Sequence, residues 1–195
     1  MSGLEYVLRS GKSVREICEA AAVTEESQAL AGSQAKPVDF VGALADADQF
    51  VEAIGFLAHA LPKREAVWWA WTCARDTAGT EPKEVIQAAL DATGSWITDP
   101  TDDNRRAAYQ AAQDADIGTP AGCAGAAAFF CGDTMGPPDQ PPMPPGEYMA
   151  AKAIAGCILL SAATKPEEIG DLFRDFMSRG LDVAERVQLW HPPEG

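Results

Sequence analysis

Six prolines stand within nine residues of this 195-residue chain, in the stretch PPDQPPMPP at positions 137–145. Proline has no backbone N–H and a fixed φ, so it cannot continue the interior of a helix. The stretch is therefore predicted to be a loop with polyproline II character. Because long unsupported loops are uncommon in compact domains, we expect it to clamp across the protein's own surface. Presentation to an aromatic groove on another protein is the alternative.

Signals for helix starts recur along the rest of the chain, whereas alternating strand patterns are nearly absent. Ser13 followed by Glu16 is typical of a capping box. Thr101 and Thr119 stand where N-cap residues are expected, and Pro120 fits the first turn of the helix that follows Thr119. These signals predict an all-α fold.

The order of the signals predicts a single-domain bundle of about seven helices, with the proline-rich loop before the last two. Those two helices are expected at 147–163 and 166–189. Residues 1–36 are expected to form an N-terminal helix and a polar linker, and residues 37–195 the helical domain. The helices around 120–131 and 147–163 are apolar on nearly every side and rich in alanine and glycine, which predicts that they form the buried centre of the bundle.

Three of the five tryptophans fall within four positions, in the stretch WWAW. At about 100° per residue, Trp71 shares an arc with Val67 and Ala70, and Trp68 lies at the edge of that arc. We therefore expect Trp71 in the core and Trp69 on the opposite side of the helix. Two interpretations of Trp69 stay open. It packs under another segment of the same chain, such as the proline-rich loop, or it anchors a protein partner.

The second interpretation defines a candidate partner-binding surface. Tryptophan and arginine are favoured at the energetic centres of protein interfaces, and two arginines lie close to Trp69 in the sequence. Prolines of the loop are included because proline rings dock well on aromatic surfaces. The candidate partner-binding residues are Trp69, Arg64, Arg75, Pro141, Pro142, Pro144 and Pro145.

Motifs for catalysis, metal binding or cofactor binding are missing from the sequence. SGKS at 10–13 lacks the earlier glycine of a phosphate-binding loop, because Tyr6 stands at that position. Only two histidines occur, His59 and His191, and neither stands at metal-ligand spacing from the cysteines. We therefore predict no catalytic residue, no metal and no cofactor. An unrecognised helical active site that uses His59 with nearby carboxylates remains an alternative.

The charge of the chain excludes two classes of partner. The chain carries 15 Lys+Arg against 29 Asp+Glu, a formal charge of −14, so its surface repels nucleic-acid phosphates and anionic lipids. The longest apolar stretch, 153–163, is about half as long as a membrane helix needs to be, which predicts no membrane insertion. The five cysteines are odd in number and form no C-x-x-C pair, which is typical of a reducing compartment. We therefore expect a soluble, cytoplasmic protein.

Four separated stretches, in order, carry a resemblance to a known family: LPKREAVWWA, DPTDDNRRAAYQAA, GTPAGCAGAAAFF and GPPDQPPMPPGEYMAAKAIAGCILLSAA. Over roughly residues 40–190 the chain resembles an uncharacterised bacterial family of all-helical domains of unknown function. Members of that family occur partly near type VI secretion gene clusters, so the resemblance implies a link to a secretion system. It implies no activity and no catalytic residues.

These observations together predict a non-enzymatic cytoplasmic interaction protein, an adaptor or accessory scaffold that binds a protein partner. The acidic surface, Trp69 and the proline-rich loop favour this function. The enzyme that uses His59 is one alternative. A binder of small apolar ligands that uses the tryptophan cluster is the other.

Overall fold

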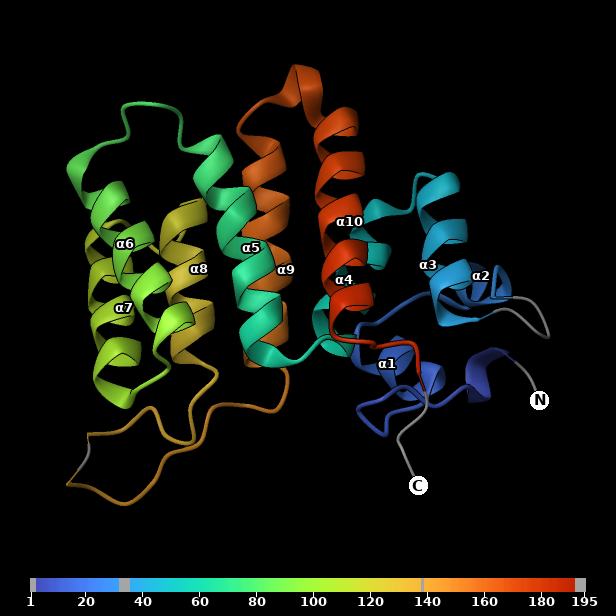
Figure 1. The fold of residues 1–195 in the computed structure, drawn as a ribbon, viewed down its shortest axis with the longest axis horizontal. Helices are drawn as coiled ribbons and strands as arrows, with labels where there is room; N and C mark the ends of the chain where they lie inside the picture. The colour runs from blue at the N-terminus through green and yellow to red at the C-terminus, as the bar shows by residue number, and fades with distance from the viewer. Residues whose placement is uncertain (1–2, 32–35, 138, 192–195) are drawn as a thin grey trace. The chain divides into compact units, whose positions relative to one another are not determined.

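The computed structural model describes residues 3–31, 36–137 and 139–191. Within these ranges the fold is all-α, as predicted, with ten α-helices and no strand (Figure 1). The helices outnumber the expected seven, and two of them, α2 (Glu25–Ala29) and α3 (Pro37–Asp46), arise where no helix is predicted. The proline-rich stretch lies between α8 (Pro120–Phe129) and α9 (Met149–Ala163), so two α-helices follow it, as the sequence predicts.

The chain divides into two compact units, residues 1–62 with 170–195, and residues 63–169. The predicted boundary after residue 36 adjoins residues 32–35, which lie outside the described ranges, so it stays a prediction. Besides α2 and α3, the helices of the first unit are α1 (Val14–Ala20), α4 (Phe50–Ala60) and α10 (Ile169–Arg186).

Local capping and aromatic packing build the first unit. The Ser13 hydroxyl accepts from the Glu16 amide at 3.2 Å, and the Glu16 carboxylate accepts from the Ser13 amide at 2.6 Å, which confirms the predicted capping box at α1. Phe40 of α3 meets Phe56 of α4 edge to face, with ring centres 5.4 Å apart. Both rings are buried, so this pair joins the two helices through the core of the unit.

The second unit is a bundle of five helices joined by short connections, apart from the proline-rich one (Figure 1). Helix α8 packs against the other four. Thr101 and Thr119 accept hydrogen bonds from the amides of Asn104 and Gly122, which confirms both predicted N-caps. The helices are α5 (Lys63–Thr77), α6 (Glu84–Thr98), α7 (Asp102–Asp114), α8 (Pro120–Phe129) and α9 (Met149–Ala163).

Glycine brings α8 unusually close to α7. A Cβ at Gly125 would lie 2.7 Å from the Ala108 carbonyl oxygen, and a Cβ at Gly122 would overlap the Asp116 carbonyl. Every residue from Ala121 to Phe129 is buried, as predicted for the bundle centre, whereas α9 is buried along one side only.

Every helix in the described part of the chain is too short or too polar to cross a membrane.

The expectation that Trp71 is the core tryptophan of α5 is wrong, whereas the burial of Trp69 agrees with the interpretation that it packs under another segment of the same chain. Trp69 is 0% exposed and is among the largest fully buried side chains, whereas Trp68 and Trp71 are partly exposed. The expectation assumed one buried arc along the helix. The structure buries Ala66 and Cys73 as well as Val67, so the buried surface of α5 extends beyond that arc and includes Trp69.

Candidate functional site

The proline loop, residues 133–147, connects α8 to α9 at one end of the second unit (Figure 1). Pro141, Pro142 and Pro144 are exposed, and Met143 between them is 53% exposed. Residues 141–146 are in neither helix nor strand, which confirms that the prolines interrupt the helical structure. The interpretation of the loop as an internal clamp is wrong for these three prolines, because their rings lie open to solvent instead of covering the bundle.

Hydrogen bonds within the loop close its base. The Met135 amide donates to the Met143 carbonyl at 2.7 Å, and the Met143 amide donates to the Thr134 hydroxyl at 2.9 Å. The same hydroxyl accepts from the Gly136 amide at 3.1 Å. Thr134 therefore ties the incoming and outgoing arms of the loop together.

Three residues of α7, here called the arginine clamp, hold the incoming arm: Asp102, Arg105 and Arg106. Arg105 Nη2 donates to the Thr134 carbonyl at 2.9 Å, and Arg106 Nη2 donates to the Gly136 carbonyl at 2.7 Å. The Asp102 carboxylate accepts from Arg105 Nε at 2.9 Å and from Arg106 Nε at 2.6 Å. One carboxylate thus orients both guanidinium groups toward the loop.

Arg105 is the central member of the clamp. Its side chain is only 4% exposed, and its Nη1 donates to the Phe129 carbonyl at 2.7 Å. The guanidinium also lies 4.7 Å from the centre of the Phe129 ring. Hydrogen bonds to Asp102 and to two backbone carbonyls compensate the burial of its charge. Arg105 therefore links the end of α8 to the loop that follows it.

Electrostatics and close packing reinforce this arrangement. The hydrogen bonds from Arg106 and Arg105 hold the pKa of the Asp102 carboxyl below its ordinary value, so the carboxylate stays charged at neutral pH. A Cβ at Gly132 would overlap the Arg105 guanidinium, which therefore lies directly against the backbone at that position. Sequence reasoning missed both arginines, although two consecutive arginines three and four residues after Asp102 indicate ion pairs along a helix.

The structure does not gather the predicted partner-binding residues into one surface. Arg64 Nε donates to the Ile97 carbonyl at 2.6 Å, at the end of α6. Arg64 also lines a hollow of about 460 Å³ together with Arg105, beside the clamp. Arg75 lies over the Trp71 ring, 4.5 Å from its centre. Trp69 is buried. Within the predicted set, Pro141, Pro142 and Pro144 are exposed close to one another on the loop, and Pro145 is half-buried.

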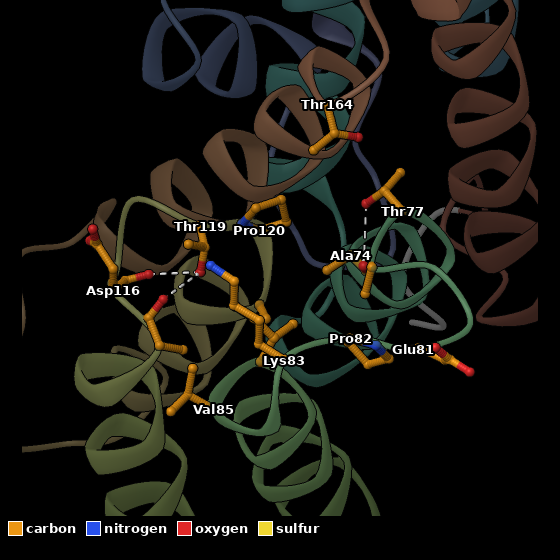
Figure 2. Close-up of a pocket in the computed structure, with 14 residues that line it drawn as sticks. Ala74, Thr77, Glu81, Pro82, Lys83, Val85, Asp116, Thr119, Pro120 and Thr164 are labelled. Carbon is orange, nitrogen blue, oxygen red and sulfur yellow. Dashed lines mark hydrogen bonds between the residues drawn. The ribbon is translucent and has the colours of Figure 1, made fainter.

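A cleft of about 580 Å³ opens at the opposite end of the second unit from the proline loop (Figure 2). Its wall is mostly apolar, and Figure 2 shows the Lys83 side chain extending toward Asp116 and Thr119. At the rim of the cleft, the Thr119 hydroxyl donates a hydrogen bond to the Asp116 carbonyl, three residues earlier in the chain, at 2.7 Å. The described lining residues are Ala74, Thr77, Ala78, Glu81, Pro82, Lys83, Val85, Ile86, Ala115, Asp116, Thr119, Pro120, Ala121 and Thr164.

This lining contains no tryptophan among the described residues, so the cleft is not the apolar site expected at the tryptophan cluster. Trp71 instead contacts α6, where its Nε1 donates to the Leu90 carbonyl at 2.8 Å. A Cβ at Gly94 would lie 3.4 Å from the Trp71 ring, which shows how closely the ring and α6 pack.

His59 and the cysteines are the side chains with potential for nucleophilic chemistry, and they lie partly or fully within the packed structure. His59 Nδ1 lies 2.8 Å from the Gly55 carbonyl oxygen, one turn earlier in α4. Burial raises the pKa of the Cys18 and Cys131 thiols to about 12 and that of Cys123 to about 11, so these thiols are protonated at neutral pH. Among the described residues, His, Cys, Asp and Glu form no group of three that could hold a metal ion.

Most of the chain matches a known protein family. Residues 40–184 match DUF6931, which is described as a family of unknown function. No curated protein and no solved structure matches the chain. The matched region contains the arginine clamp, the proline loop and the cleft, and the family description attaches no activity to any of them.

Proposed function

The chain belongs to a family of unknown function, DUF6931, and we propose from its own geometry that it is a non-enzymatic interaction protein that presents the proline loop to a protein partner. The observation that carries the proposal is the exposure of Pro141, Pro142, Met143 and Pro144 on a loop whose base is held by the arginine clamp. An exposed apolar segment of this kind is typical of a recognition surface.

The clamp gives the loop an advantage as a ligand. A flexible segment loses conformational entropy when it binds, whereas a segment already held near its bound conformation loses less. Proline itself restricts φ, and the bonds from Arg105 and Arg106 fix the arm that leads to the prolines. The chain therefore supports an adaptor or accessory scaffold whose binding segment is ordered before the partner arrives.

The proposal extends to the setting of the protein. A cytoplasmic adaptor beside a bacterial type VI secretion apparatus is the setting that the family resemblance implies. The odd number of cysteines and the absence of a C-x-x-C pair from the sequence agree with a reducing compartment. The acidic surface favours a protein partner over nucleic acid.

Affinity capture from a lysate of the source organism tests the proposal. The immobilised wild-type chain is compared with a variant in which Pro141, Pro142, Met143 and Pro144 are replaced by serine. A synthetic peptide of residues 133–147 is then used to elute the bound proteins. We expect at least one protein that the wild type retains, the serine variant does not, and the peptide elutes.

A matched control separates the loop from the cleft. Lys83→Ala and Val85→Ser change the exposed rim of the cleft and leave the loop intact. We expect this variant to retain the same protein as the wild type. If the retained proteins are the same with and without the loop residues, the proposed function is wrong.

A further inference from the structure

We infer that the partner's binding site is a groove lined by aromatic side chains and rimmed by lysine and arginine. This inference rests on the proposed function and names the chemistry of the partner that the loop fits. It follows from two properties of the loop: which backbone groups it offers, and which charges surround them.

The loop offers almost no backbone donors. Pro141, Pro142, Pro144 and Pro145 have no N–H, and the Met143 amide already donates to the Thr134 hydroxyl at 2.9 Å. A partner that binds by adding a β-strand needs alternating N–H and carbonyl groups, so it cannot pair with residues 141–145. What remains for recognition is the proline rings, the Met143 side chain and backbone carbonyl oxygens.

Aromatic side chains match this set of groups. Tryptophan and tyrosine present flat apolar faces for proline rings, and each also carries an N–H or O–H that can donate to a carbonyl oxygen. The Met143 side chain is 53% exposed, and a thioether makes favourable contacts with aromatic rings. The aromatic groove is therefore the complement of the 141–145 segment.

The charged residues of the loop itself are all acidic, although Lys63, Arg64 and Arg105 line a hollow together with Asp133 at the base of the loop. Residues 132–151 contain Asp133, Asp139 and Glu147, all exposed, and no lysine or arginine. The nearest cations of the clamp, Arg105 and Arg106, share the Asp102 carboxylate and donate to loop carbonyls. The chain as a whole carries −14. A partner with an acidic rim would be repelled, and one with a basic rim would be attracted.

The probe for the test is the protein that the peptide of residues 133–147 elutes from the immobilised chain. The Kd of this protein for the full chain is measured at a low and a high salt concentration, about 50 mM and about 500 mM NaCl, at which charges are weakly and strongly screened. The variants are Asp139→Asn with Glu147→Gln for charge, and Pro142→Ala with Pro144→Ala for the rings. Glu84→Gln with Glu167→Gln makes the same change in net charge at the start of α6 and in the short 3-10 helix Pro166–Glu168 that follows α9, away from the loop.

We expect the loop charge variant to raise the Kd roughly three- to tenfold at low salt and to match the wild type at high salt, because the Debye length shrinks. The proline variant should raise the Kd about tenfold or more at both salt concentrations. The Glu84 and Glu167 variant should bind like the wild type. All these positions are exposed, so each variant should fold like the wild type, and thermal melts check this.

The outcomes separate the two proposals. If the immobilised wild type retains no protein that the serine variant of the loop loses, the proposed function fails. If a protein is eluted and its Kd is unchanged or lowered by salt and by the loop charge variant, the basic rim is wrong although the proposed function stands. If the proline variant binds like the wild type, the aromatic groove is wrong. Cross-linking that maps the contact to an RNA or to a membrane lipid also overturns the inference.

Discussion

Arg106 of α7 donates a 2.7 Å hydrogen bond to the carbonyl oxygen of Gly136, thirty residues later in the chain. Its neighbour Arg105 does the same for Thr134 at 2.9 Å. The conformation of the proline loop is thus set by a distant helix as well as by its own prolines. Changes in the arginine clamp should consequently alter both the stability of the second unit and the presentation of the loop.

Replacement of Arg105 by alanine should lower the free energy of unfolding by about 2–4 kcal/mol. The change leaves the Phe129 and Thr134 carbonyls without this donor, and it costs less than breaking a fully buried pair because Asp102 is half exposed. Urea denaturation measures the loss. Lys152→Ala, on the exposed side of α9, is the control and should change stability by less than about 0.5 kcal/mol. Equal losses in the two variants would contradict the role of Arg105.

The clamp should also make stability depend on pH. The hydrogen bonds from Arg106 and Arg105 lower the pKa of Asp102 in the folded state below its ordinary value of 3.8, so the unfolded state takes up a proton more readily. The stabilisation from Asp102 is therefore complete above the unfolded pKa and is lost as the pH falls through the folded pKa.

Denaturation of wild type and Asp102→Asn between about pH 6 and pH 3 measures this contribution. We expect the wild type to be the more stable at pH 6 and the difference to shrink as the pH falls. Asp103→Asn is the matched control, since both arginine ion pairs end on Asp102. A difference that is the same at every pH would contradict the linkage.

Gly132→Ala should destabilise the protein, because the new Cβ would overlap the Arg105 guanidinium and displace it from its partners. The expected loss is about 1–3 kcal/mol, the usual cost of overpacking. Gly42→Ala is the opposite case. Gly42 lies inside α3, and a Cβ at this position would meet no atom within 4 Å, so alanine there should stabilise the helix by about 0.5–1 kcal/mol. Thermal or urea melts of both variants check the opposite signs.

Trp69→Ala should cost about 3–5 kcal/mol, because it removes a fully buried side chain from the core. Trp71→Ala should cost less, since Trp71 is only partly buried, although it loses the bond to the Leu90 carbonyl and the contact with Arg75. Urea melts measure both losses. A larger loss for Trp71 than for Trp69 would mean that Trp69 is not the core residue of this cluster.

These tryptophans show where sequence reasoning works and where it stops. The caps at Ser13, Thr101 and Thr119 are predictable because each partner lies three residues away in the sequence. The buried state of Trp69 is not predictable from one helical arc, because α5 is buried beyond that arc.

The candidate site follows the same distinction. The proline-rich sequence shows that helix must stop at the loop, and the local chemistry of proline suffices for that prediction. Its exposure, and its attachment through Arg105 and Arg106, depend on partners 29 and 30 residues away. A pattern of nearby residues carries no information about such contacts.

Site-specific photocross-linking at position 143 tests the central claim most directly. A photoreactive amino acid replaces Met143 in the proline loop, and in a second chain it replaces Leu160, an exposed apolar residue of α9. Each chain is irradiated in a lysate of the source organism, with and without the peptide of residues 133–147. The claim that the loop is the binding surface predicts one cross-linked protein from position 143, absent from position 160 and suppressed by the peptide. Identical cross-linked products from the two positions, or none from position 143, would contradict it.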